Sequence, residues 1–414
     1  MKPLYEAIFT LTKAAILRQQ PDSVCGIDDW QELFLLLRSG KLQGVTYKTV
    51  SSLPEAKNAP EHFLTAWKTT VFQNGMKQLS STQEVRFVLQ RATERGLAPV
   101  LFKGLVLAAL YPEPSMRFSS DADIYIPTEQ RLSMEQLLTS LGYALIPEAS
   151  KEHVPVYRIN TGNRCLTIEL HDCLWEDYTG TQANILDSLH LTAPDTFITQ
   201  SPFGFPILTL GHTEHLIYQI FHMAKHFAFE GLRLRFLTDL TLFVNAYKNE
   251  VDFVRFWDTM EKLGYSSFAL ALLNICYCHL GLTEGILTPQ QKKKTVNEMV
   301  TEDILLVGKV TAYKVENWAS TDLLASYFMR DRGASSGTQH KLEIFFPMPS
   351  ALKDKFSYAR KCPLLLPVAW IHRFFSAFLY SMQCKKNNQS ASDVLSNAEY
   401  RLALMKSVGL VDTK

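Results

Sequence analysis

Two aspartates spaced two residues apart are the best candidates for chemistry in this sequence. Asp121 and Asp123 follow Ser119-Ser120 and alternate with apolar residues as far as Ile126. Because side chains alternate along a strand, both carboxylates point to one face and the apolar residues to the other. Two hard oxygen ligands at fixed spacing suit Mg²⁺ or Mn²⁺. The pattern predicts a buried strand over 117–126 that carries metal ligands.

A third carboxylate lies in a later alternating segment. In Thr167-Ile168-Glu169-Leu170-His171, Glu169 lies on the opposite face from Ile168 and Leu170. If this strand lies near Asp121 and Asp123, Glu169 faces the same metals and accepts the proton of an acceptor hydroxyl. Two divalent cations held by such carboxylates activate one oxygen and stabilise the leaving one in phosphoryl transfer. His171 shares the face of Glu169, and both a site role and a structural role stay open for it.

Residues suited to phosphate binding precede the carboxylates. Lys103-Gly104 lies at an expected strand-to-helix turn, where glycine lets the backbone approach a phosphate and a helix N-terminus favours anions. Lys103 adds a positive charge. Arg117, Ser119 and Ser120 are expected to contact triphosphate oxygens.

A histidine-rich segment, 213–229, has helical periodicity. His222 and His226 have the spacing of a zinc-binding pair, with Asp239 as the third ligand that such a site needs. In the alternative interpretation, this helix closes a nucleotide cleft, Lys225, Arg233 and Arg235 contact phosphates, and Asp239 pairs with an arginine. A polar seam with a purely structural role is the third interpretation.

The elements that position these residues predict an α+β fold. Residues 1–96 form an N-terminal helical region, 97–200 a small mixed sheet with helices on one side, and 201–414 a C-terminal helical region. In the middle region we expect strands at 99–102, 117–126, 143–146, 154–159 and 166–170, with helices at 105–110 and 131–141. Thr128 is a candidate N-cap, and the Asn/Gly-rich residues 160–163 indicate a hairpin.

The C-terminal region is expected to be largely helical. After 213–229, the helix-like stretches are 251–283, 286–315, 320–330, 350–360 and 364–406, and 333–338 has the composition of a flexible loop. The most apolar late run, 364–380, is too short and too polar to span a bilayer. Its amphipathic, basic character leaves weak peripheral membrane contact open.

Composition narrows the class of protein. With 414 residues, 47% hydrophobic and 20% charged, the chain is ordinary globular protein. A net charge of +1 favours a small molecule, peptide or protein over a long nucleic acid as partner. The seven cysteines are scattered and no signal-peptide pattern occurs, which together predict a reduced, cytoplasmic protein.

Taken in order, these motifs resemble the bacterial uncharacterised nucleotidyltransferase family of the polymerase-β-type nucleotidyltransferase superfamily. The matching segments are Phe102-Lys103-Gly104, Tyr111-Pro112, Arg117, Asp121-Ala122-Asp123, Glu169-Leu170-His171, His222 to His226, Leu234 to Asp239, and Leu364-Leu365-Leu366-Pro367 to His372-Arg373. The sequence departs from the superfamily pattern at Leu105, where a hydroxyl residue is usual, and at Glu169, where Asp is commoner.

The resemblance implies Mg²⁺-dependent transfer of a nucleoside monophosphate from an NTP to an acceptor hydroxyl or phosphate, with release of pyrophosphate. Asp121, Asp123 and Glu169 would be the catalytic and metal-binding residues. Lys103, Gly104, Arg117, Ser119, Ser120 and Lys225 would bind the nucleotide. A non-catalytic nucleotide-binding or antitoxin-like module and a zinc hydrolase built on His222 and His226 are the alternatives. The sequence identifies neither the acceptor nor the NTP.

Overall fold

Five strands form one mixed sheet in the computed structural model of the chain. The strands are β1 (Val100–Phe102), β2 (Ala122–Tyr125), β3 (Ala144–Leu145), β4 (Val156–Thr161) and β5 (Arg164–His171), in the spatial order β1-β2-β5-β4-β3. β2 and β5 are parallel, and the other neighbouring pairs are antiparallel. The predicted hairpin is therefore confirmed, as β4 and β5. A separate two-stranded sheet joins β6 (Phe197–Gln200) to β7 (Ile207–Leu210).

The structure describes residues 2–21, 24–150, 154–162, 164–175, 181–292, 296–310, 356, 358–359, 362–372 and 391–411. The helices before the second half of the chain are α1 (Pro3–Ile16), α2 (Trp30–Ser39), α3 (Gln43–Ser51), α4 (Phe63–Glu94), α5 (Gly104–Ala108), α6 (Thr128–Ser140) and α7 (Thr181–Ser188). Those that follow are α8 (His212–Phe229), α9 (Leu234–Tyr247), α10 (Phe253–Leu263), α11 (Ser266–Ile275), α12 (Glu298–Val310) and α17 (Ala391–Ser407).

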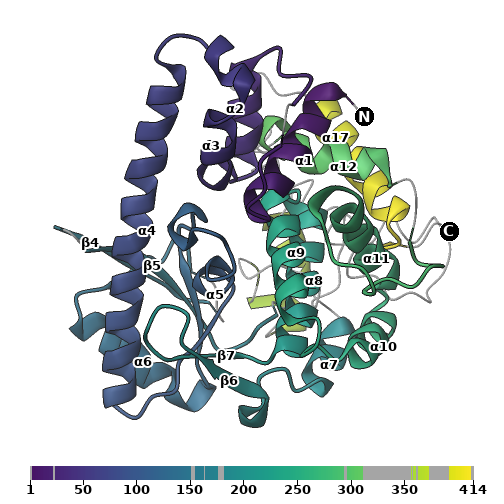
Figure 1. Ribbon diagram of the computed structural model, residues 1–414. Coiled ribbons are helices and arrows are strands. Elements are labelled where there is room, and N and C mark those ends of the chain that lie inside the picture. The colour runs from purple at the N-terminus through teal and green to yellow at the C-terminus, as the bar shows by residue number, and fades with distance from the viewer. Residues whose placement is uncertain are drawn as a thin grey trace, which may run out of the picture.

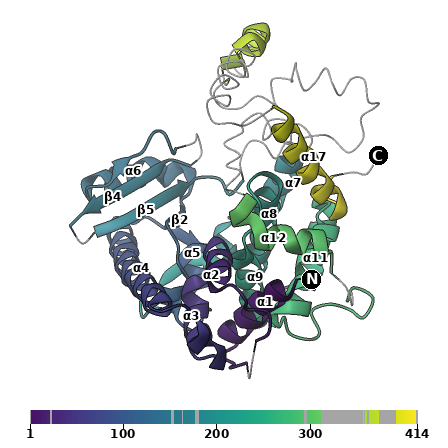
Figure 2. The same cartoon turned by 90° about the horizontal axis from the view of Figure 1, so that it is seen from above.

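Side-chain alternation gives the two faces of the five-stranded sheet different surroundings. The even-numbered residues of β2 and β5, such as Ile124 and Ile168, cluster with apolar side chains of α4 and α6. The odd-numbered residues Asp123, Glu169 and His171 point the other way and line a cavity. In Figure 1 α4 runs along the sheet, and Figure 2 shows α6 beside β4 and β5.

The N-terminal and C-terminal helices share one hydrophobic cluster. Leu11 of α1, Leu37 of α2 and Trp67 of α4 belong to the same buried cluster as residues of α8, α9 and α11. Figure 1 shows α1, α8, α9 and α11 grouped on the side of the molecule away from α4. In the part of the chain that the structure describes, no helix is both long enough and apolar enough to cross a bilayer.

Several predicted boundaries need correction. The strand expected over 117–126 is shorter, because pairing with β1 and β5 covers only Ala122–Tyr125, and the Arg117 side chain bonds to Gly104 and Asp239. Thr128 is the first helical residue of α6, and Pro127 holds the N-cap position.

In the C-terminal region, the stretch 251–283 is divided at Gly264, which ends α10 with a φ of 69°. The predicted helix over 286–315 begins only at Glu298, because Thr288 and Gln291 close a turn around Pro289. The stretches 320–330 and 333–338 lie outside the described residues, as do Arg373 and most of 350–360.

Candidate metal and nucleotide site

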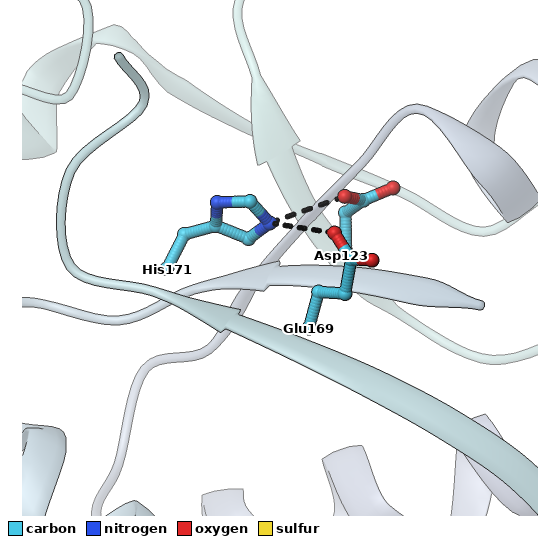
Figure 3. Close-up of side chains that lie close together, drawn as sticks. All are labelled: Asp123, Glu169 and His171. Atoms are coloured by element: carbon cyan, nitrogen blue, oxygen red, sulfur yellow. Dashed lines mark hydrogen bonds and ion pairs between the residues drawn. The ribbon is translucent and has the colours of Figure 1, made fainter. Parts of the chain in front are cut away.

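Three ligand-type side chains meet on adjacent parallel strands. Asp123 of β2 pairs in register with Glu169 of β5, and His171 lies two residues further along the same face. The His171 Nε2 atom lies 3.1 Å from Asp123 Oδ1 and 3.8 Å from Glu169 Oε2 (Figure 3). One ligand atom from each residue lies within 4.8 Å of the others. Two carboxylates and an imidazole in this arrangement can hold a divalent metal ion.

A partly buried lysine contacts the same carboxylate. The Lys103 Nζ atom donates to Asp123 Oδ1 over 2.9 Å, and the Lys103 backbone N–H lies 3.3 Å from His215 Nε2. Lys103 has a φ of 55°, a conformation that is strained for a residue other than glycine. The strained turn therefore directs the ammonium group of Lys103 into the carboxylate cluster. Sequence reasoning expected this group to contact a phosphate.

The three ligand groups have perturbed titration behaviour. Burial and the carboxylates of Asp123 and Asp121 raise the pKa of Glu169 to about 7. Burial tends to raise the pKa of Asp123, but the Lys103 ammonium and the His171 imidazole outweigh it and hold that pKa well below its usual range. Burial lowers the pKa of His171 and keeps its imidazole neutral near pH 7. Clustered shifts of this kind are characteristic of functional sites.

Asp121 lies at the edge of this cluster and not within it. Ser119 Oγ and Ser120 Oγ lie 3.2 and 3.3 Å from its two carboxylate oxygens, so both serines hold Asp121 ahead of β2. Asp121 lines the same cavity as Asp123 and Glu169. Its charge contributes to the raised pKa of Glu169.

The cavity has a volume of about 440 Å³, which falls within the size range of small-molecule sites. Every sequence-predicted site residue lines it: Lys103, Gly104, Arg117, Ser119, Ser120, Asp121, Asp123, Glu169 and Lys225. Its wall also includes Lys41, Gln219, His222, His226, Arg233 and Arg235. Gln219 is buried, and its Nε2 atom has no partner among the described residues.

Arg117 is engaged by protein groups and not directed at a ligand. Its Nε and Nη2 atoms donate to the two carboxylate oxygens of Asp239, each over 2.7 Å, and its Nη1 atom donates to the Gly104 carbonyl over 2.8 Å. Tyr111 Oη donates to the same Asp239 over 2.7 Å. Arg117 thus supports the Lys103-Gly104 turn, and the pairing of Asp239 with an arginine is confirmed.

The histidines of α8 border the site without forming the zinc centre that was one of the alternative interpretations of this segment. The Nε2 atoms of His222 and His226 lie 3.0 Å apart, and His226 Nδ1 lies 2.9 Å from Glu230 Oε2. Asp239, the third ligand that a zinc site would need, is occupied by Arg117 and Tyr111. Within the described ranges, the one group of three metal-ligating side chains in close contact is Asp123, Glu169 and His171.

Sequence reasoning missed Lys41 and left His171 undecided. His171 has a sequence signal, because it alternates in phase with Glu169 on β5. Lys41 has no sequence signal, because it follows a helix in a region with no other candidate residues. It reaches the cavity only through tertiary packing.

Comparison with known proteins gives a family match and distant structural likenesses. The model of a family described as "Uncharacterised nucleotidyltransferase" matches residues 27–281. A crystal structure of ANT(2")-Ia in complex with adenylyl-2"-tobramycin is 12% identical, with 44% of this chain and 95% of that chain covered and a TM-score of 0.30. An antigenic nucleotidyltransferase-like protein from Paracoccidioides brasiliensis is 15% identical, with 41% and 76% covered and a TM-score of 0.29. No curated protein matches the chain.

Proposed function

The chain belongs to the uncharacterised nucleotidyltransferase family, and from this membership we propose that it transfers a nucleoside monophosphate from an NTP to an acceptor hydroxyl or phosphate in a reaction that needs Mg²⁺ or Mn²⁺. An acceptor oxygen attacks the α-phosphorus, the bond from that phosphorus to the bridging oxygen of the β-phosphate breaks, and pyrophosphate leaves. The near-neutral net charge supports a small molecule, peptide or protein as acceptor over a long nucleic acid.

The observation that carries this proposal is the pairing of Asp123 with Glu169 across β2 and β5 inside the cavity. With His171 they form a donor set that fits a divalent cation, and Asp121 adds a fourth group at the edge. The bound cation would stabilise charge on the phosphate oxygens. In the metal-free protein, the Lys103 ammonium group offsets part of the negative charge of Asp123.

Each residue then has a role. Asp121, Asp123, Glu169 and His171 would hold the metal, and Glu169 would also assist deprotonation of the acceptor. The Lys103-Gly104 turn, Ser119 and Ser120 border the triphosphate, and Lys225 of α8 lines the same cavity. Arg117 positions the turn through the Gly104 carbonyl.

The test is label transfer by the full-length protein. Each NTP, labelled at the α-phosphate, is incubated with Mg²⁺ or Mn²⁺ and with cell extract as the source of acceptor, and pyrophosphate release is followed in parallel. Asp123→Asn and Glu169→Gln should each reduce transfer by about 1,000-fold or more, since several kcal/mol of transition-state stabilisation depends on them. Glu129→Gln, an exposed position on α6, is the matched control.

Two outcomes would reject the proposal. Transfer that is unchanged in Asp123→Asn would place the chemistry elsewhere. NTP binding by the wild-type protein with no label transferred to any extract component would favour the non-catalytic binding module.

A further inference from the structure

Three cations from distant parts of the sequence meet on one wall of the cavity. Lys41 follows α2, and Arg233 and Arg235 lie at the start of α9. All three line the cavity that contains Asp121 and Asp123. This basic cluster lies in the N-terminal and C-terminal helical regions, outside the sheet that carries the carboxylates.

The fold holds the two segments together through backbone contacts. The Arg233 Nη1 atom donates to the Ser39 carbonyl over 2.9 Å, and the Arg235 backbone N–H donates to the Gly40 carbonyl over 3.1 Å. A Cβ atom on Gly40 would lie 3.4 Å from Leu234 Cβ, an ordinary contact distance, so the two segments pack closely here. Lys41 follows with a φ of 62°, in the left-handed region that is uncommon for lysine.

The positive charge of the basic cluster is not neutralised by ion pairs. In the ranges that the structure covers, Lys41, Arg233 and Arg235 form no salt bridge, and the arginine partners are carbonyl groups, including Phe118 O at 2.5 Å from Arg235 Nη1. The Arg235 Nε atom is buried and has no hydrogen-bond partner there. Burial and the neighbouring Arg233 and Arg235 lower the pKa of Lys41, while Asp121 opposes that effect. Such a site gains from an anionic ligand.

Two of the cations that sequence reasoning assigned to phosphates, Lys103 and Arg117, are engaged by carboxylates, whereas Arg233 and Arg235, which it placed at phosphates if the histidine-rich helix closes a nucleotide cleft, are not. Lys103 bonds to Asp123, and Arg117 bonds to Asp239. The charge to meet phosphate groups must therefore come from other residues. The basic cluster supplies it, and Asp121 interacts electrostatically with both the cluster and Glu169.

We propose that Lys41, Arg233 and Arg235 bind the β- and γ-phosphates of the NTP, an assignment that rests on the proposed function. Arginine presents a planar fork suited to phosphate oxygens, and lysine adds a point charge. The first turn of α9 adds the positive end of a helix dipole. Phosphate groups held here lie near Asp121, whose charge acts on Lys41, and the rest of the cavity is left for the nucleoside or the acceptor.

The test is binding by isothermal titration calorimetry on the full-length protein with Mg²⁺ at fixed ionic strength. Inorganic tripolyphosphate and each NTP are titrated separately. Lys41→Gln and Arg233→Gln should each weaken binding of tripolyphosphate and of the preferred NTP about tenfold, the value of one charge-assisted hydrogen bond. Lys41→Arg should restore most of the affinity. Lys48→Gln, on the exposed face of α3, should bind as the wild type does.

The outcomes separate this inference from the proposed function. Wild-type affinities in Lys41→Gln and Arg233→Gln would overturn the inference and leave the nucleotidyl transfer intact. Weakened tripolyphosphate binding with unchanged NTP binding would reassign the cluster to a phosphorylated acceptor and also overturn it. If the wild-type protein binds none of these probes, both proposals fail. Among the described residues the Lys41 side chain makes no hydrogen bond, so Lys41→Gln breaks none there, and it serves as the variant least subject to misfolding.

Discussion

Arg117 and Asp239, 122 residues apart in the sequence, form a two-pronged buried ion pair with both N–O distances at 2.7 Å. The pair connects the loop before β2 to α9. Through the Gly104 carbonyl it also fixes the turn that carries Lys103. A single ion pair therefore joins the sheet, the turn and the helical body around the site.

Asp239→Asn should destabilise the fold by about 3–5 kcal/mol, because it leaves the buried Arg117 guanidinium without a counter-charge. Chemical denaturation measures the loss. Asp258→Asn is the matched control, because its partner Lys262 and Asp258 itself are more than half exposed, and removal of an exposed pair costs less than about 1 kcal/mol. Equal effects of the two substitutions would contradict the structural role of the Arg117–Asp239 pair.

Lys103 allows a test that separates charge from backbone strain. Lys103→Met should destabilise the metal-free protein by about 3 kcal/mol, because Asp123 loses its ammonium partner. Lys103→Gly loses the same charge but relieves the positive φ, so it should be about 1–2 kcal/mol more stable than Lys103→Met. Saturating Mn²⁺ should reduce the deficit of both variants. A deficit that Mn²⁺ leaves unchanged would argue against a metal at Asp123.

The raised pKa of Glu169 predicts that metal binding depends on pH. With a pKa of about 7, the carboxyl is largely protonated below pH 7, and a proton must leave before the metal binds. Mn²⁺ affinity should fall about tenfold per pH unit below 7 and level off above it. Titrations between pH 5.5 and pH 8 measure this. Glu169→Gln should bind more weakly and lose this dependence; an equally steep dependence in that variant would assign the proton to another group.

Buried His215 predicts a loss of stability in acid. Burial lowers its pKa to about 3, so the folded state keeps the imidazole neutral while the unfolded chain takes up a proton below about pH 6.5. Stability from this group is complete above pH 6.5 and falls with pH, by about 2 kcal/mol at pH 5. Denaturation at pH 7 and pH 5 should show a smaller pH effect in His215→Gln than in the wild type. His62→Gln, a mostly exposed control, should match the wild type.

The sequence predicted the residues of the site better than their contacts. Alternation in β2 and β5 is a local property, so it placed Asp123 and Glu169 on one face and indicated a mixed sheet correctly. The length of a strand depends on its pairing partners, and Asp121 falls outside β2 because β1 and β5 pair only with residues 122–125. Sequence reasoning assigned Arg117 to triphosphate oxygens because no local pattern indicates its distant partner, Asp239. Lys41 was missed because no short-range pattern indicates which loop will face a distant cavity.

The hydrophobic cluster shared by the two helical regions has a consequence for synthesis of the chain. Lys41 emerges from the ribosome long before Arg233 and Arg235, and Asp123 long before its neighbours on α8. At about 5–20 residues per second, α1 must wait about 10–40 seconds for the α8 partners that bury its apolar face. The cavity is thus a late product of folding, and a nascent chain that ends before Arg233 lacks both the guanidinium group that bonds to Ser39 and the Asp239 carboxylate that pairs with Arg117.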